Sequence, residues 1–432
     1  MPKPSPQLTI VLTLAASTLA GWGLLTLPFT HGSGYAVAEG AWLDHLFTAT
    51  SAISTTGLTT LTVASDYSVW GQVVILLLIQ LGGLGYVALA GLMVPFADGG
   101  FSEYKAKTLG ESAYVPESVS PRTFVSEAWR FILVCEGVGA GLLAWGFHES
   151  GKGWGEAAWW GVFHAVSAFC TAGFGLDPGS MVPYAGNALV TWPTMVLAVG
   201  GAVGFMFVAG LAARRRRDDG DFDPMSRGVL TTFVILLALF ALRFGLGSDV
   251  IRESDAPVSN ALFLAVTSLT GAGFSTVGTG ALSFSILVAL LLPMCIGGAP
   301  TGTSGGMKLH NVGVALRLIF ARVRGGEDAT ARFGGAEVTR DTATGSAATV
   351  TLYVLLLVLG ASAAFAIEGE RFGFEELMFE VVSAVGTVGL STGITSDLST
   401  GAKGLLVGLM YVGRVGVLAL VSGVAGRRGG GR

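Results

Sequence analysis

Four copies of one short pattern contain the residues of this chain that are best suited to binding an ion. In each copy a Phe stands ten residues before a Gly, and a Ser or Thr stands six residues before that Gly. The copies are Phe47–Gly57, Phe163–Gly173, Phe263–Gly273 and Phe379–Gly389. Four matches at near-equal spacing indicate a fourfold internal repeat rather than chance.

The chemistry of such loops is the replacement of water around a cation. Backbone carbonyls at the ends of short pore helices can take the place of the water shell, and Gly tolerates the backbone angles that turn carbonyls inward. Thr387-Val388-Gly389 is similar to the Thr-Val-Gly core of a potassium-channel filter. We therefore predict potassium at the carbonyls of Gly57, Gly173, Gly273 and Gly389. The predicted filter positions are Thr55, Thr56, Gly57, Thr171, Ala172, Gly173, Gly271, Ala272, Gly273, Thr387, Val388 and Gly389. The alternative is that the four Gly serve tight turns or helix packing.

Composition places these loops in a membrane protein. Of the 432 residues, 51% are hydrophobic and 12% are charged, whereas about a quarter of a soluble domain is charged. The five His form no ligand cluster, and no acid, base and nucleophile combine into a catalytic set, so we predict no enzyme activity. The three Cys show no metal-ligand spacing, and neither a Walker motif nor a site for an organic cofactor is present.

Each copy of the pattern lies between two apolar segments of roughly the 20 residues that a bilayer requires. The segment that carries the pattern is too short to span and is predicted to be re-entrant. We therefore predict an all-α membrane protein with eight transmembrane helices and four re-entrant pore helices around one central pore. The predicted repeats are residues 1–97, 98–212, 213–320 and 321–432. The first apolar run resembles a signal peptide at its start, but its length to Phe29 favours a retained helix.

Two further features break the ordinary rules for a membrane span. In the third repeat, Gly, Pro and hydroxyl residues interrupt an apolar segment after Ile296, and broken backbone at this depth must be buried or line water. Arg414 places a cation within an apolar span of the fourth repeat. We predict a gate formed by Gly297, Gly298, Ala299, Pro300, Thr301, Gly302, Thr303, Ser304, Gly305, Gly306, Lys308 and Arg414. The alternatives are a simple short loop, and for Arg414 a pair with Glu136 or with backbone carbonyls.

Charge predicts the orientation. Most of the 25 basic residues fall on one side of the predicted spans, which places both termini in the cytoplasm by the positive-inside rule. Arg214–Arg217 is interpreted as a topology anchor, with a nucleic-acid patch as the less favoured alternative, so no nucleic-acid partner is predicted. The opposite side carries carboxylates, among them Asp44, Asp66, Asp177 and Asp397, which raise the local cation concentration.

At these residues the chain resembles the membrane subunits of the Trk/Ktr/HKT superfamily of potassium transporters. The resemblance covers essentially the whole chain, through the four glycine loops, Ile79–Gly85, the Gly298–Lys308 loop, Phe379–Ser391 and Gly413–Gly416. The chain lacks the extra N-terminal helix pair of Trk-type subunits and is most similar to the Ktr type, KtrB. This similarity implies a homodimer in the lipid of the bacterial plasma membrane, with one pore per subunit. It also implies a cytoplasmic, nucleotide-binding KtrA-like ring as partner and potassium uptake, with sodium as a second candidate ion.

Two of the four loops depart from the pattern of that family. The third loop has Thr270-Gly271 where Arg-Thr is usual, and the second has Thr171 where Asn is usual. Sodium-preferring plant members of the family have Ser at the position of Gly57. The Gly in this chain therefore favours potassium as the transported ion. Two other functions remain open at this stage: an alternating-access transporter, whose repeats are often inverted whereas these are parallel, and a non-transporting scaffold or sensor, which needs no filter-like loops.

Overall fold

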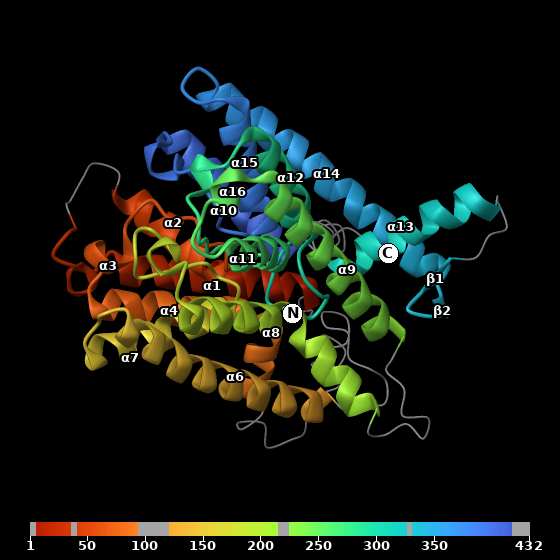
Figure 1. The fold of residues 1–432 in the computed structure, drawn as a ribbon, viewed down its shortest axis with the longest axis horizontal. Coiled ribbons are helices and arrows are strands. Elements are labelled where there is room, and N and C mark those ends of the chain that lie inside the picture. Colours follow the sequence, from red (N-terminus) through yellow and green to blue (C-terminus); the bar gives the residue numbers. More distant parts are fainter. Residues whose placement is uncertain (1–5, 36–40, 94–120, 215–223, 326–330, 417–432) are drawn as a thin grey trace, which may run out of the picture.

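The computed structural model describes residues 6–35, 41–93, 121–214, 224–325 and 331–416, and the described chain is almost entirely helical (Figure 1). The helices are α1 (Pro6–Leu25), α2 (Ala41–Ile53), α3 (Val63–Asp66), α4 (Val69–Met93), α6 (Pro121–Glu149), α7 (Trp154–Phe169), α8 (Ala188–Arg214), α9 (Pro224–Gly247), α10 (Asp249–Arg252), α11 (Pro257–Thr270), α12 (Phe284–Ile296), α13 (Leu309–Gly325), α14 (Arg340–Glu368), α15 (Phe374–Gly386) and α16 (Thr400–Val415). Most of the predicted topology anchor Arg214–Arg217, and the end of the last predicted span after Gly416, lie outside the described residues.

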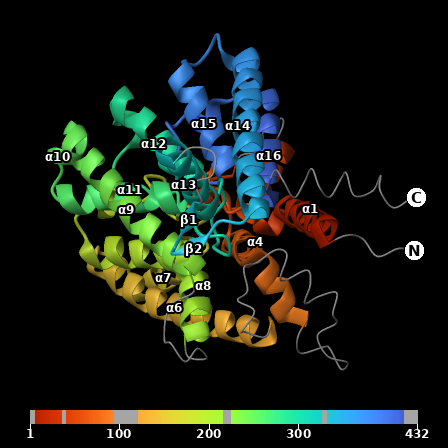
Figure 2. The same cartoon turned by 90° about the vertical axis from the view of Figure 1, so that its right-hand side faces the viewer.

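Four helix groups follow one another along the chain. Within each group a short helix that carries the Phe-to-Gly pattern packs against a helix before it and a helix after it. The groups are α1, α2 and α4; α6, α7 and α8; α9, α11 and α12; and α14, α15 and α16. Figure 2 shows the groups on different sides of a common centre, with α14 to α16 at the top and α6 to α8 at the bottom.

Contacts between the groups close a ring. The last helix of each group packs against the short helix of the next group: α4 on α7, α8 on α11, and α12 on α15. The ring closes because α16, near the end of the described chain, packs against α2. The short helices are therefore enclosed by longer ones, and their Phe residues are among the most buried side chains in the molecule. Phe47, Phe163, Phe263 and Phe379 are each at most 1% exposed.

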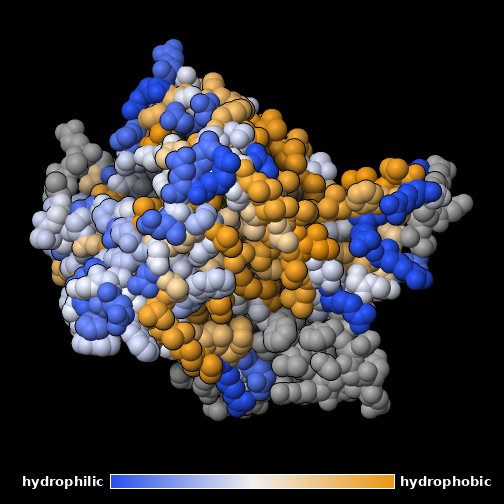
Figure 3. Space-filling model, viewed as in Figure 1, coloured by the Kyte–Doolittle hydropathy of each residue, from blue (hydrophilic) through white to orange (hydrophobic). Residues whose placement is uncertain are grey.

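The outer surface matches a membrane environment. Apolar side chains gather over the middle of the face in Figure 3, whereas polar side chains gather at its left edge and around the hairpin at the right. By length and composition, three helices in the described residues can cross a membrane: Ser126–Glu149, Pro224–Gly247 and Arg340–Glu368. Five shorter apolar helices accompany them, in α1, α4, α8, α11 and α12.

The third group contains the interruption that the sequence indicates. Helix α12 ends at Ile296 and α13 begins at Leu309, and residues 297–308 between them form the interrupting loop. Backbone bonds at both ends fix this loop, since Met307 N–H donates to the Cys295 carbonyl (2.9 Å) and Leu309 N–H donates to the Gly298 carbonyl (2.9 Å). A small hairpin of β1 (Arg332–Phe333) and β2 (Ala336–Glu337), which the sequence analysis did not predict, follows α13.

Candidate functional site

The four glycine segments have the same backbone course. The residue two positions before each motif glycine is left-handed, with φ of 53° at Thr55, 51° at Thr171, 70° at Gly271 and 50° at Thr387. Left-handed backbone costs a side-chain-bearing residue roughly 1–2 kcal/mol, so Gly271 is the easiest of the four to accommodate. The third segment therefore departs from the usual sequence without departing from the shared backbone course.

The Ser or Thr of the pattern holds this turn. Its backbone carbonyl accepts a hydrogen bond from the backbone N–H of the residue just before the motif glycine. The distance is 2.8 Å from Thr56 N to the Ser51 carbonyl and 2.9 Å from Val388 N to the Ser383 carbonyl. In these two segments the hydroxyl also accepts from the glycine itself, at 3.0 Å for Ser51 and Gly57 and 3.0 Å for Ser383 and Gly389. The spacing of six residues thus has a direct hydrogen-bonding cause in the first and fourth segments, whereas the buried hydroxyls of Ser167 and Thr267 have no hydrogen-bond partner in the described residues.

The motif glycines form a ring. Gly57 lies against Gly173, Gly173 against Gly273, Gly273 against Gly389, and Gly389 against Gly57. All four have positive φ, at 91°, 69°, 74° and 91° in chain order. A Cβ on Gly57 would overlap the carbonyl oxygen of Ala172, so this ring leaves no room for a side chain on that residue.

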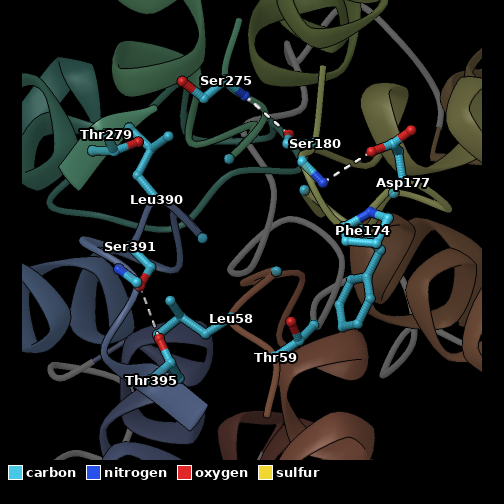
Figure 4. Close-up of a pocket in the computed structure, with 18 of the residues that line it drawn as sticks. Leu58, Thr59, Phe174, Asp177, Ser180, Ser275, Thr279, Leu390, Ser391 and Thr395 are labelled. Atoms are coloured by element: carbon cyan, nitrogen blue, oxygen red, sulfur yellow. Dashed lines mark hydrogen bonds between the residues drawn. The ribbon is translucent and has the colours of Figure 1, made fainter. Parts of the chain in front are cut away.

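A hollow of about 520 Å³ opens on one side of the glycine ring. Its wall begins at the four glycines and continues through the residues that follow them. Figure 4 shows these residues arriving from four sides, with Leu58, Phe174, Ser275 and Leu390 from different segments. The wall is mostly apolar side chains, hydroxyl groups and backbone.

Asp177 is the single ionisable residue in the wall of this hollow, among the described residues. Its carboxylate accepts from Gly179 N–H at 2.9 Å and from the Tyr184 hydroxyl at 3.4 Å. Burial and the nearby Asp177 carboxylate raise the pKa of Tyr184 to about 12, so this tyrosine keeps its proton at neutral pH. Asp177 therefore brings one fixed negative charge to the mouth of the glycine ring.

The interrupting loop lies on the other side of the ring, against all four left-handed residues. The Thr303 hydroxyl is 3.0 Å from the Thr171 hydroxyl, and the Thr303 carbonyl is 3.5 Å from Thr55 Oγ1. Ser304 lies beside Gly271, and Gly305 lies against the hydroxyl of Thr387. Three consecutive loop residues thus cover the end of the ring away from the hollow.

Helix α8 anchors this loop. Ala299 N–H donates to the Ala202 carbonyl at 2.9 Å, and Thr303 N–H donates to the Gly201 carbonyl at 3.1 Å. Within the loop, the Ser304 hydroxyl accepts from Gly298 N–H at 2.7 Å, and the Lys308 ammonium donates to the Ser304 carbonyl. These hydrogen bonds within the loop and to α8 make it a fixed part of the fold rather than a loose connection.

Arg414 joins the loop to two other helix groups. Its guanidinium donates to the Thr55 hydroxyl at 3.0 Å, to the Gly83 carbonyl at 3.2 Å, and to the carbonyls of Gly82 and Thr303. The guanidinium therefore pairs with a hydroxyl and backbone carbonyls rather than with Glu136. Glu136 instead accepts from the Gln80 amide at 3.1 and 3.2 Å.

The structure thus places the predicted filter and gate residues next to one another. The hollow lies on one side of the glycine ring, and the interrupting loop lies on the other. Sequence reasoning missed the contacts of Thr303 and the partner of Glu136, because no pattern in the chain pairs residues so far apart. It also passed over His164 and Glu380, although aligning the four copies places both directly after the motif Phe.

Comparison with known proteins gives consistent results. The TrkH family model, described as a cation transport protein, matches residues 10–218 and 228–425. The potassium/sodium uptake protein NtpJ of Enterococcus hirae is 32% identical over 425 residues, covering 96% of this chain and 92% of that protein. The Ktr system potassium uptake protein B of Bacillus subtilis is 28% identical, with 96% of this chain and 92% of that protein covered.

A solved structure has the same fold. The crystal structure of the potassium transporter TrkH from Vibrio parahaemolyticus superposes with a TM-score of 0.69 at 21% sequence identity. The match covers 96% of this chain and 83% of that one. These relatives are ion transporters rather than enzymes.

Proposed function

This chain belongs to the TrkH family of cation transport proteins, and from that premise we propose that it takes up potassium across the bacterial plasma membrane. The ring of Gly57, Gly173, Gly273 and Gly389 is the filter, and its carbonyls replace the water around the ion. The observation that carries this proposal is the ring itself, which joins four segments from four helix groups below an open hollow. Sodium is a second candidate ion, because NtpJ is named a potassium/sodium uptake protein.

The four helix groups support a division into four pore repeats, at 1–97, 98–212, 213–320 and 321–432. In this arrangement α2, α7, α11 and α15 are the re-entrant pore helices. Their C-terminal ends meet at the glycine segments, where helix dipoles favour a cation. The cyclic packing of each last helix on the next short helix supports four repeats around one pore.

The interrupting loop and Arg414 form the gate. Thr303, Ser304 and Gly305 cover the inner end of the filter, so an ion that leaves the glycine ring meets this loop. We further propose that the protein acts as a homodimer with both termini in the cytoplasm and a KtrA-like nucleotide-binding ring that controls the gate. Two relatives are named as components B and D of a Ktr system, which fits such an assembly.

Uptake into proteoliposomes tests the function. Purified protein should accumulate rubidium and potassium in preference to sodium, and addition of a KtrA-type ring with nucleotide should change the rate. Liposomes without protein give the background. Equal accumulation of all three ions would contradict a selective filter at the glycine ring.

Replacement of Asp177 by Asn is expected to raise the KM for potassium about threefold at low ionic strength. The change removes the one charge that the wall of the hollow carries while keeping the acceptor for Gly179. Added N-methylglucamine chloride should shrink the difference, since salt screens exposed charges. Glu253→Gln, an exposed carboxylate outside the wall, is the matched control. A KM that stays the same at every ionic strength would rule out attraction by Asp177.

Replacement of Thr303 by Ala is expected to raise the maximal uptake rate about threefold, because its hydroxyl bonds to Thr171 and to the Phe169 carbonyl (3.2 Å) hold the loop closed. Thr301→Ala is the matched control: it lies in the same loop, and its buried hydroxyl has no hydrogen-bond partner in the described chain. Rubidium flux into proteoliposomes measures both variants. A Thr303→Ala rate at or below the wild-type rate would contradict the closed-loop role.

A further inference from the structure

The position directly after the motif Phe holds a different residue in every copy, and the contacts of these side chains indicate a role outside the glycine ring. The residue directly after the motif Phe is Thr48 in the first copy, His164 in the second, Leu264 in the third and Glu380 in the fourth. All four side chains are buried, with exposed fractions of 1% at Thr48, His164, Leu264 and Glu380. Two of the four are ionisable groups, which are costly to bury without partners.

Glu380 reaches past the filter to the loop that follows it. One carboxylate oxygen accepts from the backbone N–H of Thr392 at 3.1 Å and from the Ser391 hydroxyl at 2.6 Å. The other oxygen accepts from the Thr395 hydroxyl at 2.7 Å. Thr392 stands three residues after Gly389, so this carboxylate ties the outer side of the fourth glycine to its own pore helix.

His164 makes the equivalent connection in the second segment. Its Nδ1 donates to the Trp160 carbonyl at 2.8 Å, which leaves Nε2 as an acceptor. Nε2 accepts from the backbone N–H of Leu176 at 3.3 Å. Leu176 stands three residues after Gly173, the same offset as Thr392 from Gly389. A neutral imidazole and a carboxylate thus accept from the same backbone position.

The other two segments show no bond from this position to the backbone three residues after the glycine. The Thr48 hydroxyl donates to the Asp44 carbonyl of its own helix at 2.9 Å and also interacts with the Tyr67 side chain, and Leu264 has no polar side-chain atom. The glycine contacts run in the cyclic order Gly57, Gly173, Gly273, Gly389 and back to Gly57, and this order places the second and fourth segments opposite each other. The segments with this backbone bond therefore alternate around the ring with segments for which the described residues show none.

We propose that His164 and Glu380 are positioning residues that brace two opposite segments of the glycine ring and thereby set its preference among cations. The proposal rests on the filter proposed above. A filter discriminates between ions through the placement of its carbonyls, and a buried acceptor that holds the next loop limits how far those carbonyls can move. His164 and Glu380 act through the backbone of Leu176 and Thr392 and do not touch the ion.

The test replaces each brace by the residue that the third segment uses at the same position. His164→Leu is expected to lower the preference for potassium over sodium about fivefold, as expected when one buried hydrogen bond to the following loop is lost. Glu380→Leu removes the hydrogen-bond acceptor for three residues of the following loop and is expected to lower the preference by at least as much. His164→Gln and Glu380→Gln keep a side-chain acceptor and are expected to stay within about twofold of wild type. Preference is measured as the ratio of potassium to sodium uptake in proteoliposomes made from monodisperse protein.

Two further variants keep the test decisive. Leu264→Met changes the same position in an unbraced segment with little change of volume, and it should leave the preference unchanged. If the Leu variants do not give monodisperse protein, Thr395→Val removes one donor to Glu380 from outside the pore helix. It should lower the preference in the same direction but by less. An unchanged preference in the monodisperse variants, or a shift in Leu264→Met as large as theirs, would overturn the brace.

Gly57→Ser, measured alongside, separates the brace from the filter. If Gly57→Ser lowers the preference while the brace variants do not, the filter stands and the brace is wrong. If Gly57→Ser leaves the preference for potassium over sodium unchanged, the proposal that the glycine ring is the filter is wrong, and so is the positioning role proposed for His164 and Glu380. Gln variants as impaired as the Leu variants would mean that the acceptor at these positions is not what sets the preference.

Discussion

Replacement of Gly57 by Ser is expected to lower the preference for potassium over sodium by about tenfold or more. Gly57 has φ of 91°, where a side chain strains the backbone, and a Cβ there would overlap the carbonyl of Ala172. Relief of this overlap must move either the first segment or the second. The preference among ions depends on the positions of the filter carbonyls. Displacing the carbonyls of one of the four glycine segments should therefore lower the preference more than loss of a contact outside the ring, such as that of His164 or Glu380.

The measurement is growth of a potassium-uptake-deficient host across potassium and sodium concentrations, together with uptake by purified protein. Gly404→Ser is the matched control, since Gly404 is an exposed helical glycine with open space where its Cβ would stand. The control should transport like the wild type. Wild-type ion preference in well-folded Gly57→Ser protein would contradict the filter.

Much of this arrangement can be predicted from the sequence, because the glycine pattern and the apolar spans are local signals. The short helices α11 (Pro257–Thr270) and α15 (Phe374–Gly386) lie where the sequence predicts a segment too short to span the membrane, directly before a motif glycine. Both lie between turn-forming residues and the glycine segment, so local composition fixes their ends. The break of the third group after Ile296 follows from its Gly and Pro content in the same way.

The rest depends on contacts between distant parts of the chain. Thr303 bonds to Thr171 across 132 positions, and no spacing rule links a loop hydroxyl to a threonine in another helix group. The partner of Arg414 was equally open, because Glu136 and backbone carbonyls are both acceptable partners for a buried guanidinium. Only the packing of α4 on α7 and of α16 on α2 decides which of these acceptors lies within reach.

The contacts of the residue after the motif Phe are likewise not predictable from the sequence. The sequence places His164 and Glu380 in one register, but it does not reveal that their side chains extend outward past the glycines. That direction follows from the tight turn after each short helix, which brings Leu176 and Thr392 back beside the helix. A pattern of residue types therefore suffices to propose the filter, whereas the contacts of His164 and Glu380 are visible only in the folded chain.

Replacement of Arg414 by Ala is expected to raise the maximal rate of potassium uptake about tenfold, which corresponds to about 1.4 kcal/mol of barrier. Two effects act in the same direction. The guanidinium bonds to the Thr55 hydroxyl at the inner end of the filter, where a fixed positive charge repels a passing cation by on the order of 1 kcal/mol or more. It also donates to the Thr303 carbonyl and so holds the interrupting loop across the path.

A structural role for Arg414 predicts the opposite result. If its main task is to satisfy the carbonyls of Gly82, Gly83 and Thr303, its loss should lower stability by roughly 1–3 kcal/mol for each group left unpaired. Size-exclusion behaviour, thermal unfolding and rubidium uptake on one preparation separate the two. Arg243→Ala is the matched control, because Arg243 donates to the Ser285 carbonyl at 3.2 Å from an exposed position on α9.

Arg414→Lys divides the two effects of the arginine. Lysine keeps the positive charge but cannot reach the Thr55 hydroxyl and several carbonyls at once with a planar fork. If charge sets the barrier, Arg414→Lys should transport at close to the wild-type rate. If the bond to the loop sets it, the rate should approach that of Arg414→Ala, because the loop is then free to leave the inner end of the filter. A monodisperse Arg414→Ala protein that transports no faster than wild type would show that neither effect limits the flow of ions.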